Sequence, residues 1–190
     1  MLWPDWKIRL HGPGIIKPFD ASLIQPSSID VTLDSSFYVA TARAKFRAID
    51  LRDDLSAQFK KVVVNEGEGF LLTPRSFVLA STFEHVEVPN DIACRYEGKS
   101  SLGRIGLFTH VTAGFIDPGF KGHITLELFN AAPYSIRLMP GMKIGQLCFM
   151  EMLGAPDKAY GADGVGSHYQ GQRGPTPSRI HEKFTIKNVY

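Results

Sequence analysis

The sequence predicts a mainly β protein whose many short strands form a sandwich or a barrel. Its 18 glycines and 12 prolines fall between short apolar runs, which is typical of all-β domains. Residues 123–129 alternate between apolar and polar, so that Ile124, Leu126 and Leu128 share one face of a strand. Helix-forming patterns are scarce, and no repeat of about 20–50 residues indicates a solenoid.

The predicted helices and strands can be placed in chain order. A short helix is expected near residues 6–10, and a second after Gly98, with Ser100 and Ser101 as candidate caps. Residues 160–179 are rich in Gly, Pro, Ser and Gln, and composition alone leaves a frayed terminus as their interpretation. The predicted strands are residues 29–33, 37–40, 62–64, 69–72, 77–82, 85–88, 92–96, 108–111, 123–129, 135–138 and 143–152.

Composition and charge narrow the class of protein. A chain of 190 residues, 44% hydrophobic and 21% charged, is expected to fold as one globular domain. The net charge of +2 gives no reason to expect a nucleic-acid polymer as partner. No apolar run reaches the roughly 20 residues of a membrane span, and the N-terminus lacks a secretory signal. Cys94 and Cys148 are expected to be buried thiols in a cytoplasmic protein rather than a disulfide.

Several familiar catalytic motifs are missing. Zinc-dependent cytosine deaminases need an H-x-E and a C-x-x-C, and this chain has no C-x-x-C. A P-loop and a G-x-S-x-G elbow are also absent. Any hydrolysis is therefore expected to depend on carboxylates and on magnesium brought by the substrate, without zinc.

Three segments interrupt the apolar strands with polar groups. Residues 97–104 combine glycine, cations and hydroxyls, and fit either a phosphate cradle or a capped surface helix. Residues 112–122 contain Asp117-Pro118-Gly119, which alone indicates a hairpin turn. Glu127 lies on the strand face opposite Leu126 and beside Thr125, as either a solvated acid or a proton shuttle against a pocket.

Five segments, taken in order, resemble the dCTP deaminase and dUTPase superfamily. They are residues 25–31, 98–104, 112–122, 123–128 and 140–147, and the resemblance spans roughly residues 22–179. It implies a homotrimer of distorted jelly-roll (dUTPase-like) β-barrel subunits with active sites at the subunit interfaces. Tyr160-Gly161 and residues 168–179 resemble the tail of dCTP deaminases, so one domain (1–190) with a C-terminal lid and tail (160–190) is expected.

The resemblance is closest to the bifunctional branch, which converts dCTP to dUMP. Gly114-Phe115 stand where one group of single-activity deaminases carries His-Arg, and Gln146 also matches the bifunctional pattern. His168 departs from the family, which commonly has lysine there, and this puts triphosphate affinity or lid closure in question. The alternatives are a deaminase that releases dUTP, a dUTPase, and a nucleotide-sensing regulator that binds a protein.

By resemblance, four residues carry the catalysis. Glu127 is the general base and acid, Ser100 and the backbone near Ala113 position the attacking water, Arg104 holds the phosphates, and Asp117 meets the sugar and orients a second water. Magnesium is expected on the triphosphate of dCTP or dUTP. The expected substrate-binding residues are Lys99, Ser100, Ser101, Leu102, Gly103, Arg104, Ala113, Asp117, Thr125, Leu126, Glu127, Gln146, Tyr160, His168 and Gln172.

Overall fold

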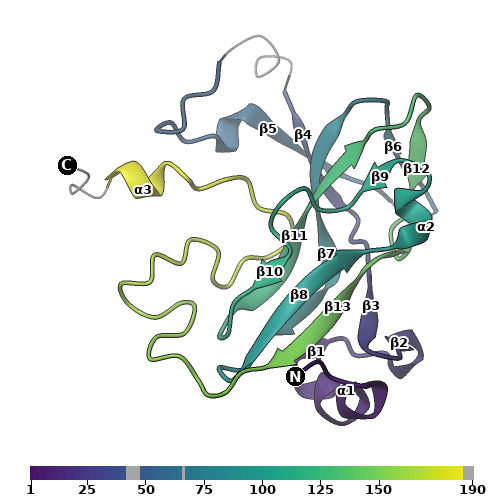
Figure 1. Cartoon of the computed structure of the whole chain (residues 1–190). Coiled ribbons are helices and arrows are strands. Elements are labelled where there is room, and N and C mark those ends of the chain that lie inside the picture. The colour runs from purple at the N-terminus through teal and green to yellow at the C-terminus, as the bar shows by residue number, and fades with distance from the viewer. Residues whose placement is uncertain (42–47, 66, 186–190) are drawn as a thin grey trace.

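The computed structural model describes residues 1–41, 48–65 and 67–185 of the chain. Two antiparallel sheets dominate it, and the chain after the last strand passes along one side of them (Figure 1). The prediction of a mainly β protein is confirmed. Among the described helices are α1 (Asp5–His11), α2 (Ser100–Gly103), α3 (Glu182–Thr185) and 3-10 turns at Gly12–Gly14, Ala21–Leu23 and Ser56–Gln58.

The larger sheet has the strand order β5-β4-β7-β11-β9, with β1 also paired to β7. The second sheet has the order β10-β8-β13-β3-β2, and β12 pairs with β6 in a separate ribbon. The strands are β1 (Ile16–Lys17), β2 (Ile24–Gln25), β3 (Ser28–Thr32), β4 (Ser36–Ala40), β5 (Phe59–Val63), β6 (Phe70–Leu72), β7 (Phe77–Glu87), β8 (Ile92–Gly98), β9 (Leu107–Phe108), β10 (Phe115–Ile116), β11 (Lys121–Asn130), β12 (Ile136–Leu138) and β13 (Lys143–Glu151).

Most predicted strands overlap strands of the structure, but several predicted features differ from it. The two strands expected at 77–82 and 85–88 are one long strand, β7. The strand expected at 108–111 is wrong beyond Phe108, since β9 ends there. The two-residue strands β1, β2 and β10 were not predicted, because two residues show no alternation. The predicted serine caps of α2 are also wrong: the helix begins at Ser100, its N-cap is Lys99, and no side chain caps it.

Strand β11 separates the core from the outer surface of the larger sheet. Its buried and partly buried residues alternate along the whole strand, as the sequence predicts. Leu126 and Leu128 are fully buried, and burial of each such side chain stabilises the fold by roughly 1.5–3 kcal/mol. His123, Thr125 and Glu127 therefore face the other way.

Residues 160–185 form the C-terminal segment, and its residues 170–176 pack along β11. The Gly171 amide donates to the Lys121 carbonyl at 2.7 Å, and the His123 amide donates to the Gln172 carbonyl at 3.1 Å. Gly122 permits this approach: its φ is +153°, and a Cβ there would lie 3.0 Å from the Gln172 carbonyl oxygen. The frayed-terminus interpretation of residues 160–179 is thus wrong.

Candidate active site

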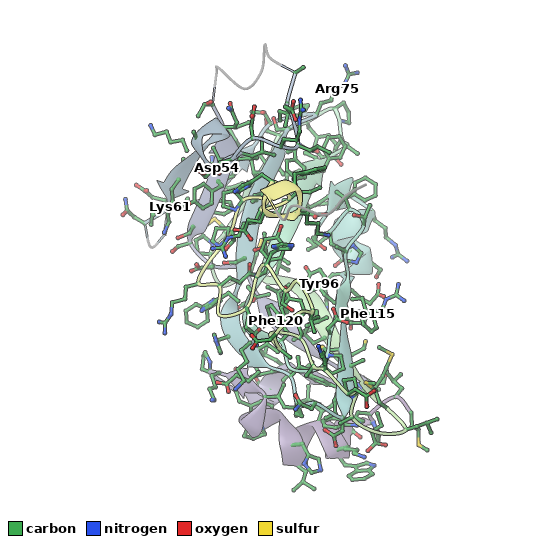
Figure 2. All side chains as sticks on the ribbon, turned by 90° about the vertical axis from the view of Figure 1, so that its left-hand side faces the viewer. Asp54, Lys61, Arg75, Tyr96, Phe115 and Phe120 are labelled. Atoms are coloured by element: carbon green, nitrogen blue, oxygen red, sulfur yellow. The ribbon has the colours of Figure 1, made fainter. Side chains whose placement is uncertain are left out.

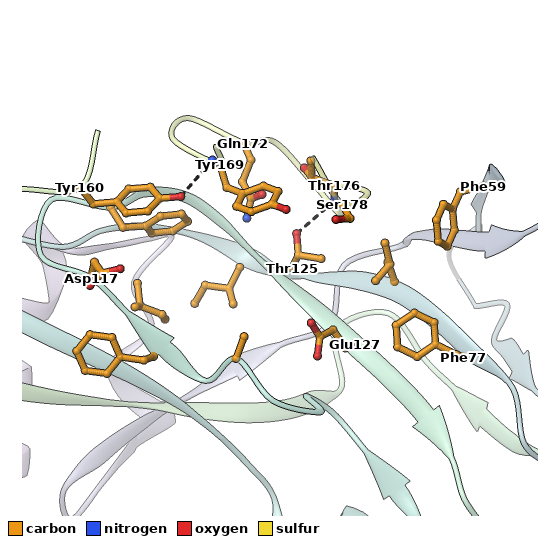
Figure 3. A pocket seen from close by; sticks show the side chains of 16 residues that line it. Phe59, Phe77, Asp117, Thr125, Glu127, Tyr160, Tyr169, Gln172, Thr176 and Ser178 are labelled. Atoms are coloured by element: carbon orange, nitrogen blue, oxygen red, sulfur yellow. Dashed lines mark hydrogen bonds between the residues drawn. The ribbon is translucent and has the colours of Figure 1, made fainter. Parts of the chain in front are cut away.

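A pocket of about 450 Å³ lies between β7, β11, β10 and the C-terminal segment (Figure 3). Acidic and hydroxyl groups and an amide lie among aromatic and aliphatic side chains, which is the usual make-up of a small-molecule site. Its lining residues are Phe59, Phe77, Leu79, Ala113, Phe115, Ile116, Asp117, Phe120, Ile124, Thr125, Glu127, Tyr160, Tyr169, Gln172, Thr176 and Ser178.

Glu127 projects from the outer face of β11 into this pocket. Its register partner in β7 is Leu79, and the Phe77 side chain lies beside it (Figure 3). The backbone amide of Val111 donates to Glu127 Oε2 at 3.1 Å. One carboxylate oxygen is thereby oriented by the protein. A half-buried carboxylate held in this way can accept a proton from water and return it to a second atom.

Asp117 lies toward the other end of the pocket, near Tyr160 (Figure 3). It follows β10 in a turn where the Phe120 amide donates to the Asp117 carbonyl at 3.2 Å. The hairpin expected here is wrong, because β10 pairs with β8 while β11 pairs with β7, so the turn carries the chain from one sheet to the other. This crossing brings Asp117 from one sheet and Glu127 from the other to the same pocket.

Tyr160 begins the part of the C-terminal segment that covers the pocket. Its ring packs edge-on against Phe120 with centroids 5.7 Å apart, and Figure 2 shows Phe120 on the face that this segment crosses. Burial raises the pKa of Tyr160, and the neighbouring Asp117 charge raises it further. The phenol therefore stays protonated at neutral pH, and its oxygen accepts a hydrogen bond from the Tyr169 amide at 3.1 Å.

Gln172 and Thr176 tie the same segment to β11 over the pocket. Gln172 Nε2 donates to the His123 carbonyl at 2.6 Å, and the Thr176 amide donates to Thr125 Oγ1 at 3.2 Å. Within the described part of the chain, the buried Gln172 Oε1 has no hydrogen-bond donor. A buried amide oxygen without a donor costs roughly 1–3 kcal/mol.

The structure divides the expected site residues into two groups. One group lines the pocket: Ala113, Phe115, Asp117, Thr125, Glu127, Tyr160 and Gln172. The other is residues 99–104 with Gln146, which lie apart from this pocket in their own chain. In that group Gln146 Oε1 accepts from Ser28 Oγ at 2.7 Å, and Lys99 Nζ lies 2.6 Å from Asp30 Oδ1. Ser100, Ser101, Gly103 and Arg104 are exposed, and Leu102 is partly buried.

Three expected residues occupy other positions. The Leu126 side chain is fully buried in the core, so the expectation that it contacts substrate is restricted to its backbone. Gly114 is buried against β8, where a Cβ would lie 2.7 Å from the Tyr96 carbonyl oxygen, and it does not line the pocket. His168 does not line the pocket, and its Nδ1 lies 2.7 Å from Glu182 Oε2.

Some pocket residues carried no signal in the sequence. Phe59 and Phe77 come from β5 and β7, far along the chain from the motifs, and read as ordinary strand residues. Tyr169, Thr176 and Ser178 lie in the tail that resembles dCTP deaminases, where that likeness could have found them. Among the described residues, no group of three or more His, Cys, Asp or Glu side chains could hold a metal ion, and no helix is long and apolar enough to cross a membrane.

Comparison with known proteins gives consistent matches. A family model described as dCTP deaminase-like matches residues 6–152. A protein of Beutenbergia cavernae named "dCTP deaminase, dUMP-forming" is 51% identical over 192 residues, covering 100% of both chains. A Rhodococcus opacus protein of the same name is 55% identical over 187 residues, 97% of this chain and 98% of that one. The structure of 2'-deoxycytidine 5'-triphosphate deaminase from Agrobacterium tumefaciens aligns with a TM-score of 0.62 at 25% identity, over 78% of this chain and 47% of that chain.

The range matched by the family model contains α2, β10 and β11, and therefore both groups of expected site residues. The C-terminal segment lies beyond that range but inside the alignment with the Beutenbergia cavernae relative, which covers the whole chain. The chain belongs to the dCTP deaminase-like family.

Proposed function

We propose that this enzyme hydrolytically deaminates dCTP and cleaves the triphosphate, giving dUMP, ammonia and pyrophosphate. The relatives named dUMP-forming at 51% and 55% identity support both halves of the reaction. The observation that carries the proposal is Glu127, whose carboxylate enters an aromatic-walled pocket with one oxygen fixed by the Val111 amide.

In the deamination, Glu127 acts as a proton carrier. Its carboxylate takes a proton from a water molecule while the water oxygen bonds to C4 of the cytosine ring. Glu127 passes this proton to the ring. It then transfers the proton of the new hydroxyl group to the amino group, and the C4–N bond breaks as ammonia leaves. Ala113 also lines the pocket, and its backbone is proposed to position the attacking water together with Ser100.

In the second step, Asp117 orients a water molecule for attack on the α-phosphate. The water oxygen bonds to phosphorus, the bond to the β-phosphate oxygen breaks, and pyrophosphate leaves. Magnesium, when bound to the triphosphate oxygens, supplies charge stabilisation for that leaving group. Asp117 offers one carboxylate at this end of the pocket, so magnesium would be held mainly by the triphosphate oxygens and water.

The pocket of one chain holds the acidic residues but not residues 99–104. We therefore infer that a second copy supplies Lys99 to Arg104 and Gln146 within a homotrimer of jelly-roll β-barrel subunits. Each subunit is one domain of residues 1–190, with 160–190 as lid and tail, acting in the cytoplasm. Arg104 from one copy would then meet the phosphates of a nucleotide whose base lies against Glu127 of another.

Chromatography of the products separates the candidate functions. With dCTP and magnesium, dUMP and pyrophosphate are expected without accumulation of dUTP. Stoichiometric dUTP without dUMP would indicate a single-activity deaminase. Hydrolysis of dUTP with no action on dCTP would indicate a dUTPase. Binding of dCTP without turnover, together with a protein captured only in its presence, would favour the regulatory alternative.

Mixing two inactive variants tests the shared site. Glu127→Gln and Arg104→Ala each disable every site of their own trimer. Random reassembly of equal amounts restores about one quarter of the sites if the two residues come from different subunits. No recovery after verified subunit exchange would place both residues in one chain.

A further inference from the structure

The buried carboxylate of Asp30 links three strands next to residues 99–104. Asp30 lies in β3, and its side chain is 1% exposed. Its Oδ1 lies 2.6 Å from Lys99 Nζ, and its Oδ2 lies 3.2 Å from Lys143 Nζ. Gln25 Nε2 donates to the same Oδ2 at 3.4 Å. Both carboxylate oxygens are therefore occupied by donors from the same subunit.

The Lys99 side chain is held at the corner between β8 and α2. Lys99 is the residue directly before α2, with extended backbone (φ −95°, ψ 129°), and its side chain is 24% exposed. A buried carboxylate stripped of its cation is strongly unfavourable, so this pairing is expected to persist. The ammonium group is thus directed toward Asp30 rather than outward.

A second contact holds the same corner from β13. Gln146 accepts from Ser28 Oγ at 2.7 Å and donates to the Gly98 carbonyl at 3.5 Å. Strand β13 pairs with β3 on one side and β8 on the other, so the ion pair and the amide bridge join the same three strands. The turn that presents Ser100, Ser101 and Arg104 is anchored at its first residue.

We propose that Asp30 is a positioning residue for phosphate binding. It holds Lys99, and through Lys99 it fixes the corner from which Ser100, Ser101 and Arg104 reach the phosphates. Lys99 then acts as a structural cation rather than as a direct phosphate ligand. This inference rests on the proposed function, because it assumes that residues 99–104 meet a triphosphate.

The test is Asp30→Asn, with inhibition constants measured for inorganic pyrophosphate and for 2'-deoxycytidine against dCTP turnover. The variant keeps the shape and removes the charge, so the corner loses its fixed geometry. The constant for pyrophosphate and the KM for dCTP are expected to rise about tenfold. The constant for 2'-deoxycytidine, which has no phosphate, is expected to stay unchanged. A loss of general stability would move both constants together.

The direction in which the pyrophosphate constant changes distinguishes a positioning role of Asp30 from direct contact between Lys99 and phosphate. If Lys99 binds phosphate itself, Asp30→Asn frees its ammonium group, and pyrophosphate binds more tightly. That outcome, an unchanged constant, or equal changes for both inhibitors would overturn the proposal. If the wild-type enzyme turns over dCTP and the pyrophosphate constant does not change in Asp30→Asn, only this inference is refuted. If the wild-type chain does not act on dCTP, the proposed function is refuted.

Lys143→Met is the matched control. It removes the other cation of Asp30, 49% exposed, and leaves the Lys99 pair intact, so a change below about twofold is expected in both constants. If Asp30→Asn does not fold, Asp30→Asn with Lys143→Met leaves only one unpaired ammonium and takes the same measurements.

Discussion

Gly122→Ala is expected to lift the C-terminal segment from the pocket without changing a pocket-lining side chain. The added Cβ would lie 3.0 Å from the carbonyl oxygen of Gln172, 3.1 Å from its Cγ and 3.2 Å from its amide nitrogen. Two of these atoms are backbone, so a side-chain rotation cannot relieve the clash. The φ of +153° at Gly122 adds strain for any residue with a Cβ.

The size of the effect follows from the cost of overpacking. One methyl group forced into a close contact costs roughly 1–3 kcal/mol. If that energy is taken from docking of the segment, the KM for dCTP rises by about 5- to 150-fold. The buried side chains of Ile124, Leu126 and Leu128 are not changed, so the thermal unfolding temperature of the sheet should fall by only a few degrees.

Steady-state kinetics and limited trypsin digestion measure the two sides of this prediction. The bond after Arg173, in the docked segment, is expected to be cut faster in Gly122→Ala. Gly154→Ala is the matched control, because its Cβ would meet nothing within 4 Å. Normal KM and normal protease resistance in Gly122→Ala would show that this contact does not hold the segment on the pocket.

The remaining predictions concern the proposed chemistry and the contact between His168 and Glu182. Glu127→Gln should bind dCTP but deaminate it about 100-fold more slowly or worse, and near-normal ammonia release would remove Glu127 from its role. Asp117→Asn should suppress phosphate cleavage, measured as dUTP accumulating in place of dUMP. Chelation with EDTA should abolish turnover and magnesium restore it, while stoichiometric zinc in elemental analysis would contradict the mechanism. His168→Ala breaks the contact with Glu182 and should raise the KM several-fold, whereas His168→Lys, which can still pair with Glu182, should not.

The sequence predicts the fold best where alternation is long. Strand β11 is bounded correctly to within two residues at its start and one at its end, because buried and outward residues alternate through it. The strand predicted at 108–111 is wrong beyond Phe108 for the opposite reason: the four residues Phe-Thr-His-Val are too few to show a period, so they cannot distinguish a strand from the loop that carries Val111 to Glu127. Two-residue strands form because they pair with strands elsewhere in the chain, and a local sequence pattern does not indicate that pairing.

The candidate site shows the same limit. Glu127 and Thr125 are found from one strand, because its inward face is apolar and its outward face is not. Asp30 lies in one of the segments that resemble the superfamily, but nothing in the sequence pairs it with Lys99, which is 69 residues away along the chain. The pairing is fixed by strand register between β3, β13 and β8, so it required the structure.

The residues of β11 that stabilise the fold and the residue proposed for the chemistry lie on opposite faces of the strand. Leu126 and Leu128 stabilise the sheet through burial, and Glu127 between them gains its position from that packing without contributing to it. In the proposed trimer, the pocket that Glu127 enters would be completed by two parts that are held differently. The C-terminal segment docks through backbone hydrogen bonds at Lys121 and His123, which can open without unfolding the sheet. Residues 99–104 are anchored by a buried carboxylate and cannot move so freely. Substrate entry is therefore expected through the segment that opens, while the phosphate contacts stay in place between turnovers.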